Sequence, residues 1–122
     1  MGVALGGTRV LLGVALLAAP SLARLWVGAA GRTPGGRVLS RSLAARDLAL
    51  GAGAIFARGH PERLRTWVSL AALGDLVDTL GTAAASGLAK PARVLVTLSS
   101  AGAAAAGTVA AFSLPADDQA CG

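Results

Sequence analysis

Four long apolar runs, separated by short connections rich in glycine, proline and arginine, dominate this sequence. They cover approximately residues 3–19, 38–57, 64–86 and 92–114. A helix rises 1.5 Å per residue, so about 20 residues span the roughly 30 Å hydrocarbon core of a bilayer. The runs are apolar around the whole helix and lack the polar face that a surface helix of a soluble protein carries. The sequence therefore predicts an all-α transmembrane fold.

The connections between the runs are short and contain residues that end helices. The segment 31–37 (GRTPGGR) predicts a loop, and Gly59, His60 and Pro61 predict a tight turn before the third run. Pro61 suits the first position of a helix. Short connections make consecutive helices antiparallel, so we expect a single domain over residues 1–122, folded as an up-down-up-down four-helix bundle.

Composition and charge agree with a membrane location. Hydrophobic residues make up 54% of the chain and charged residues 14%, against about 25% charged in a typical soluble domain. The net charge of +5 comes from basic residues that flank the apolar runs. This placement favours contact with lipid headgroups over nucleic acid binding. We expect the lipid bilayer as a partner, no nucleic acid, and a multi-pass protein of the plasma (inner) membrane.

Loop charges predict an orientation. The 24–41 and 88–93 connections hold six basic residues, and the 58–65 turn on the opposite face holds three. Cytoplasmic loops carry the excess of Lys and Arg, so both termini are expected outside. An alternative is that residues 1–23 form a signal peptide, because Ser21, Leu22 and Ala23 resemble a cleavage site. Cleavage would leave three spans.

Rows of small residues at a spacing of four predict where helices pack. In lipid, helices associate through close packing of small side chains rather than through apolar burial. The second run contains Ala45, Ala49, Gly53 and Ala57, and the fourth contains Ser99, Ala103, Gly107 and Ala111. Each row is a candidate helix contact, although a chain so rich in alanine and glycine also produces such rows by chance.

Five ionisable residues lie well inside the proposed spans, away from their ends, and form the candidate site: Arg9, Arg46, Asp47, Asp75 and Asp78. A charge at a helix centre costs about 3 kcal/mol in the bilayer, so these side chains must face one another, water or a partner. Asp75 and Asp78 are three residues apart and share one helix face. The adjacent Arg46 and Asp47 point about 100° apart around their helix.

The simplest pairing follows from these directions. Arg46 faces the third helix and pairs with Asp75 or Asp78, and Asp47 turns toward Arg9 on the first helix. Two arginines then face three aspartates. The cluster is either a structural set of ion pairs that fixes helix register or a polar site for a small molecule, an ion or protons. Contact with another subunit is a third possibility.

The segments that carry these charges resemble a known family. The stretch 43–51 (LAARDLALG) contains an A-R-D-x-x-x-G pattern, and 74–78 (GDLVD) contains a D-x-x-D pattern. In order and spacing they resemble a family of small, uncharacterised four-helix bacterial membrane proteins, and more distantly the DoxX-type proteins. The resemblance extends to about residue 112. It implies a fold and a charged cluster but no activity, because that family has none assigned.

No residue set indicates catalysis. The single histidine, His60, lies in a predicted loop, and the single cysteine, Cys121, lies far from it at the C-terminus. A Ser/His/Asp set, a phosphate-binding glycine loop after a strand and a metal-ligand cluster are therefore not expected. The sequence predicts no enzyme, no cofactor and no metal.

Two hypotheses about function follow. The first is a structural or accessory membrane protein whose charged cluster holds the bundle together or docks a partner subunit. The alternative is a small transporter or ligand-binding membrane protein that uses Asp75 and Asp78, opposed by Arg46. Transport needs a larger pathway than one four-helix unit, so the alternative predicts a homo-oligomer.

Overall fold

The chain is built from four long α-helices. The computed structural model describes residues 1–24, 28–85, 87 and 90–114, and all structural statements concern these residues. The long helices are α1 (Gly2–Ala18), α3 (Pro34–Phe56), α4 (Pro61–Ala84) and α5 (Lys90–Ser113). Two short 3-10 helices, η1 (Pro20–Ala23) and η2 (Gly28–Arg32), lie between α1 and α3. The described residues contain no strand, so the predicted all-α class with four long helices is confirmed.

The start of α3 differs from the sequence prediction. The helix begins at Pro34 rather than near residue 38. The Thr33 hydroxyl accepts a hydrogen bond from the Gly36 amide at 3.0 Å, and Pro34 occupies the first helical turn. A threonine cap followed by proline is a strong helix start, and it overrides the two glycines that follow. The prediction that the whole of 31–37 is a loop is therefore wrong from residue 34 onward.

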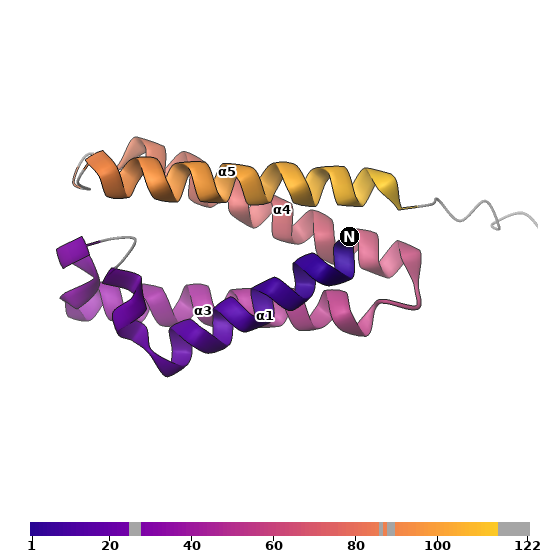
Figure 1. Cartoon of the computed structure of the whole chain (residues 1–122), viewed down its shortest axis with the longest axis horizontal. Helices are drawn as coiled ribbons and strands as arrows, with labels where there is room; N and C mark the ends of the chain where they lie inside the picture. Colours follow the sequence, from indigo (N-terminus) through magenta and orange to yellow (C-terminus); the bar gives the residue numbers. More distant parts are fainter. Residues whose placement is uncertain (25–27, 86, 88–89, 115–122) are drawn as a thin grey trace, which may run out of the picture.

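The four helices are arranged as two closely packed pairs. Figure 1 shows each long helix running opposite to the one before it, with α1 beside α3 and α5 beside α4. The two pairs meet mainly where α3 packs against α4. The N-terminus, the α3–α4 turn and the end of α5 lie at one end of the molecule (Figure 1). Consecutive long helices are therefore antiparallel, whereas the predicted up-down arrangement across a membrane stays a prediction.

Glycines bring α1 and α3 into backbone contact. A methyl group on Gly51 would lie 2.5 Å from the carbonyl oxygen of Gly6, and one on Gly13 would lie 2.8 Å from the carbonyl oxygen of Ala44. Only glycine permits two backbones to approach this closely. The row predicted on α3 does not make this contact, and it is confirmed only in its C-terminal half. Ala45 and Ala49 are exposed, whereas a methyl group on Gly53 would clash with the Trp67 ring of α4, and Ala57 is buried.

The row of small residues predicted on α5 forms part of the contact with α4. A methyl group on Gly107 would lie 3.0 Å from the Ala72 side chain of α4, and Ala111 is buried in the same interface. Ser99, at the start of the row, is exposed. The α4–α5 contact therefore uses the C-terminal part of the predicted row. The core around it consists mostly of alanine, with Leu64 and Val68 as its larger buried residues.

Helix length and composition single out α5. Among the described helices, it alone contains a segment, Arg93–Ser113, that is long and apolar enough to cross a membrane by these two measures. α1 is apolar but shorter, at 17 residues. This criterion alone does not support the multi-pass arrangement predicted from the sequence.

Candidate functional site

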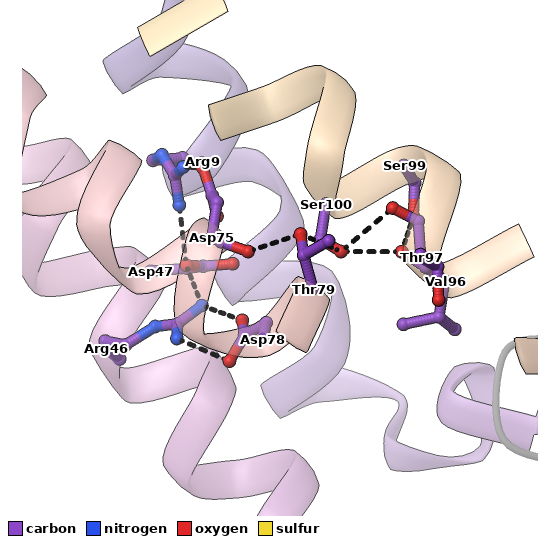
Figure 2. Close-up of polar contacts among 10 residues, drawn as sticks. All are labelled: Arg9, Arg46, Asp47, Asp75, Asp78, Thr79, Val96, Thr97, Ser99 and Ser100. Atoms are coloured by element: carbon purple, nitrogen blue, oxygen red, sulfur yellow. Dashed lines mark hydrogen bonds and ion pairs between the residues drawn. The ribbon is translucent and has the colours of Figure 1, made fainter. Parts of the chain in front are cut away.

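The five candidate side chains, brought from three helices, form one ionic network (Figure 2). Arg9 comes from α1, Arg46 and Asp47 from α3, and Asp75 and Asp78 from α4. Each residue lies in the middle part of its helix, away from the caps. The pairs α1–α3 and α4–α5 are therefore joined to each other by charge as well as by packing.

The inner part of the network has one arginine between two aspartates. Arg9 Nη1 donates to Asp47 Oδ1 at 3.0 Å, and Arg9 Nη2 donates to Asp75 Oδ2. The side chains of Arg9, Asp47 and Asp75 are only 14%, 9% and 7% exposed. With all three ionised, these inner residues carry one cation and two anions. In that ionised form the three residues have a net charge of −1.

The outer part is a two-point ion pair. Arg46 Nη2 donates to Asp78 Oδ2 at 2.7 Å, and Arg46 Nη1 donates to Asp78 Oδ1 at 3.1 Å. The two side chains are 31% and 30% exposed, so this pair is half-buried. Gly74 gives the guanidinium room, because a methyl group there would lie 3.4 Å from Arg46 Nη1. A fork-to-fork geometry of this kind fixes orientation as well as distance.

Two contacts depart from the pairing expected from the sequence. Arg46–Asp78 and Arg9–Asp47 are expected pairs, whereas Arg9–Asp75 is not. Arg46 Nη2 also reaches Asp47 Oδ1 at 3.3 Å, although the two residues are adjacent on α3. Arg46 Nη2 is thus shared between Asp47 and Asp78, while Nη1 bonds Asp78 alone. Asp47 thereby links the inner and outer parts.

The hydroxyl groups of Thr79 and Ser100 extend the polar contacts to α5. The Thr79 hydroxyl donates to the backbone oxygen of Asp75 at 2.7 Å and lies 2.9 Å from the Ser100 hydroxyl (Figure 2). Ser100 in turn bonds the backbone oxygen of Val96. Thr79 follows Asp75 by one helical turn, and that spacing is the signal that could have identified it.

A cavity opens onto the inner part of the network. Its volume is about 160 Å³, and its lining includes Arg9, Asp47 and Asp75 together with Trp67 and Thr8. Leucines, small residues and the indole ring of Trp67 make most of the wall apolar. The cavity lies between the two helix pairs, because its lining comes from all four long helices. It could hold a ligand of a few heavy atoms beside the excess carboxylate.

The single histidine and the single cysteine do not belong to the network. His60 is exposed at the α3–α4 turn, and Cys121 lies outside the described residues. Within the described part of the chain, no three His, Cys, Asp or Glu side chains group as a metal site would.

Comparison with known proteins identifies no relative. The chain matches no protein-family model, no curated protein and no solved structure. The resemblance to small four-helix bacterial membrane proteins therefore stays a prediction, and functional inference rests on the geometry of the network and the cavity.

Proposed function

We propose that this chain is a multi-pass protein of the plasma membrane that acts as a structural or accessory bundle, alone, as a homo-oligomer or with a membrane partner subunit. Its buried ionic network holds α1, α3 and α4 in one register. The observation that carries the proposal is an inverted distribution of polarity: the charges pair inside the bundle, while large apolar side chains point outward.

Outward-facing apolar residues occur on every long helix. Leu11 on α1 is 73% exposed, Phe56 on α3 83%, Leu80 on α4 62% and Phe112 on α5 85%. Soluble monomers rarely expose apolar surface so extensively, because burying it is the main driving force of folding. Lipid tails would cover this surface on all sides. The helices also satisfy their own backbone hydrogen bonds, as a lipid environment requires.

The internal charges account for the low hydropathy of α3 and α4. Both helices, at 23 and 24 residues, are about 35 Å long and exceed the hydrocarbon thickness. Their central charges, Arg46 and Asp47 on α3 and Asp75 and Asp78 on α4, are paired within the bundle. The mean hydropathy of a single helix counts these charges as if they faced lipid, although they are paired inside the bundle. α1 is apolar apart from Thr8 and the paired Arg9, and at 17 residues it is short; tilt of its neighbours or local thinning of the bilayer accommodates this length.

The network is suited to fixing register. Sliding α1 by one turn, about 5.4 Å, would separate Arg9 from both of its carboxylates, and sliding α4 by one turn would separate it from Asp75. In an apolar environment unpaired charges are strongly disfavoured, so shifted arrangements are excluded. Small-residue contacts alone discriminate poorly between registers in a chain with so many alanines. A structural role therefore explains why costly charges sit at the centre.

The membrane proposal predicts resistance to extraction and a defined position for the C-terminus. In membranes from expressing cells, alkaline carbonate should leave the chain in the pellet, because four apolar helices hold it there. With the six-charge face in the cytoplasm, the native Cys121 should react with a membrane-impermeant maleimide in intact spheroplasts. Release of the chain by carbonate would rule out the integral membrane proposal.

Matched cysteines test the orientation independently. In a Cys121→Ser background, Gly59→Cys reports the α3–α4 connection, at the end of the bundle where α5 ends, and Gly87→Cys reports the α4–α5 connection at the opposite end. Gly59 and Gly87 are both exposed. Labelling at residue 59 but not at 87 supports outside termini. The reverse pattern would invert the proposed orientation without affecting membrane insertion.

The cavity favours a second candidate function, which is binding or transport of a small cation. Its lining holds the inner residues Arg9, Asp47 and Asp75, whose ionised charges sum to −1, and an indole ring that can face a cation. A monovalent cation of a few heavy atoms would neutralise this excess. The structural and binding roles use the same carboxylates, so an experiment must separate them.

Fluorescence of Trp67 should detect such a ligand. In a Trp26→Phe variant, Trp67 is the only indole, and it lines the cavity. Titration with sodium or ammonium ions at constant ionic strength, with choline as the bulky replacement cation, should change its emission in a saturable way. Asp75→Asn should abolish the change, whereas the exposed Glu62→Gln control should preserve it. Flat titrations with both ions would reject this candidate and leave the structural role in place.

A further inference from the structure

A second hollow lies on the outer surface of the α4–α5 pair, away from the ionic network. It is a groove of about 420 Å³. Leu73 and Leu76 line its α4 side, and Ala105 and Phe112 line its α5 side. The only charged residue among those that line it is Arg65, near the start of α4. The groove is therefore mostly apolar, with the single positive charge of Arg65 at one end.

Arg65 is held at the end of α5. Its Nε donates to the carbonyl oxygen of Ala111 at 3.1 Å, and its Nη2 donates to that of Leu114. These acceptors are neutral carbonyls, so the side chain keeps its positive charge. The apolar segment of α5 ends at Ser113, between the two acceptors. In a membrane, Arg65 therefore lies at the level where hydrocarbon gives way to headgroups.

The length of the groove corresponds to one leaflet. From Arg65 to Leu76 the chain advances eleven residues along α4, which is about 16 Å. Half of the roughly 30 Å hydrocarbon core is about 15 Å. The groove thus runs from the headgroup level to the middle of the bilayer, which is the depth that one acyl chain occupies.

We infer that this groove binds one anionic phospholipid, with an acyl chain along Leu73, Leu76 and Ala105 and the phosphate group at Arg65. The inference rests on the proposed membrane location. Charge complementarity selects the occupant: residues 58–65 carry three arginines and one glutamate, a net charge of +2 within that segment. A partner helix would cover the apolar walls equally well but would not by itself place an anion at Arg65.

Lipid titration with paired variants tests the inference. The purified chain in neutral detergent is titrated with dioleoyl phosphatidylglycerol and, separately, dioleoyl phosphatidylcholine, and native mass spectrometry counts the bound molecules. One phosphatidylglycerol should bind about fivefold more tightly than phosphatidylcholine, as expected for one arginine at an anionic headgroup. Arg65→Gln should remove the preference. Ala105→Phe, which fills the groove, should weaken binding of both lipids.

Two controls separate the groove from general surface effects. Arg63→Gln removes the same charge from an exposed position that does not line the groove, and Val109→Phe adds bulk to an exposed position on α5. Both should bind phosphatidylglycerol as wild type does. Equal affinity of wild type for the two lipids, or an Arg63→Gln loss equal to that of Arg65→Gln, would overturn the inference.

The outcomes also distinguish this inference from the membrane proposal. A chain that resists carbonate extraction but shows no phosphatidylglycerol preference refutes the lipid site alone. A chain that carbonate releases refutes the membrane location itself. A dimer peak that Ala105→Phe abolishes would identify a second copy of the chain as the occupant and would likewise overturn the lipid assignment.

Discussion

Arg9→Gln is expected to destabilise the bundle by about 3–5 kcal/mol, the cost of removing one partner from a buried ion pair. Arg9 is the shared cation of Asp47 and Asp75, and all three side chains are at least four-fifths buried. Asp47 retains its 3.3 Å contact with Arg46, but Asp75 loses its ion pair. Thermal unfolding in mild detergent should show a large fall in melting temperature.

The charge count predicts that Asp75→Asn and Arg9→Gln lower stability by different amounts, which a simple packing defect would not predict. Asp75→Asn keeps the side-chain volume and removes one negative charge from a group of one cation and two anions. Arg9 then still pairs with Asp47, so the loss of stability should be much smaller than for Arg9→Gln. The exposed Arg41→Gln control should stay within about 0.5 kcal/mol of wild type. Equal losses for Asp75→Asn and Arg9→Gln would contradict this account.

Helical spacing within one segment could be interpreted from the sequence alone. Asp75 and Asp78 share a face because they are three residues apart, and this correctly directs Arg46 toward α4. The contact between Arg9 and Asp75 could not be predicted in the same way. It depends on how α1 is rotated and how closely it approaches α4, and no local pattern specifies either quantity.

The rows of small residues show a second limit of prediction from the sequence. α3 contains so many alanines and glycines that several faces satisfy a spacing of four, and the face with Ala44 and Gly51 is the one that contacts α1. The face of α3 that makes this contact is determined by where Gly6 and Gly13 of α1 can approach the α3 backbone. Similarly, α3 begins at Pro34 because Thr33 caps it, a local signal that the glycine-rich composition of 31–37 concealed.

Gly51→Ala should separate α1 from α3 and destabilise the protein by about 2 kcal/mol. The new methyl group would lie 2.5 Å from the carbonyl oxygen of Gly6 and 3.0 Å from the amide nitrogen of Val10. Both atoms belong to backbone, so no rotamer change relieves the clash, and overpacking of this kind costs about 1–3 kcal/mol. Alanine gains up to about 1 kcal/mol in helix propensity over glycine, which the clash outweighs.

Gly102→Ala is the matched control, because this α5 residue is exposed and a methyl group there would have no neighbour within 4 Å. It should leave stability unchanged or raise it by up to about 1 kcal/mol. Chemical unfolding of both variants in one detergent measures the difference. A Gly51→Ala protein as stable as Gly102→Ala would show that α1 and α3 do not approach each other as closely as described.

The Gly51 contact should also be coupled to the ionic network. Gly6 precedes Arg9 by about one turn on α1, and Gly51 follows Asp47 by one turn on α3. A displacement that relieves the clash therefore lengthens the Arg9–Asp47 pair, which is 3.0 Å in the intact protein. The double variant Arg9→Gln, Gly51→Ala should then lose less stability than the sum of the two single losses, by at least about 0.5 kcal/mol. Strict additivity would mean that packing and charge act independently, and that the close glycine contact is not what positions Arg9 against its carboxylates.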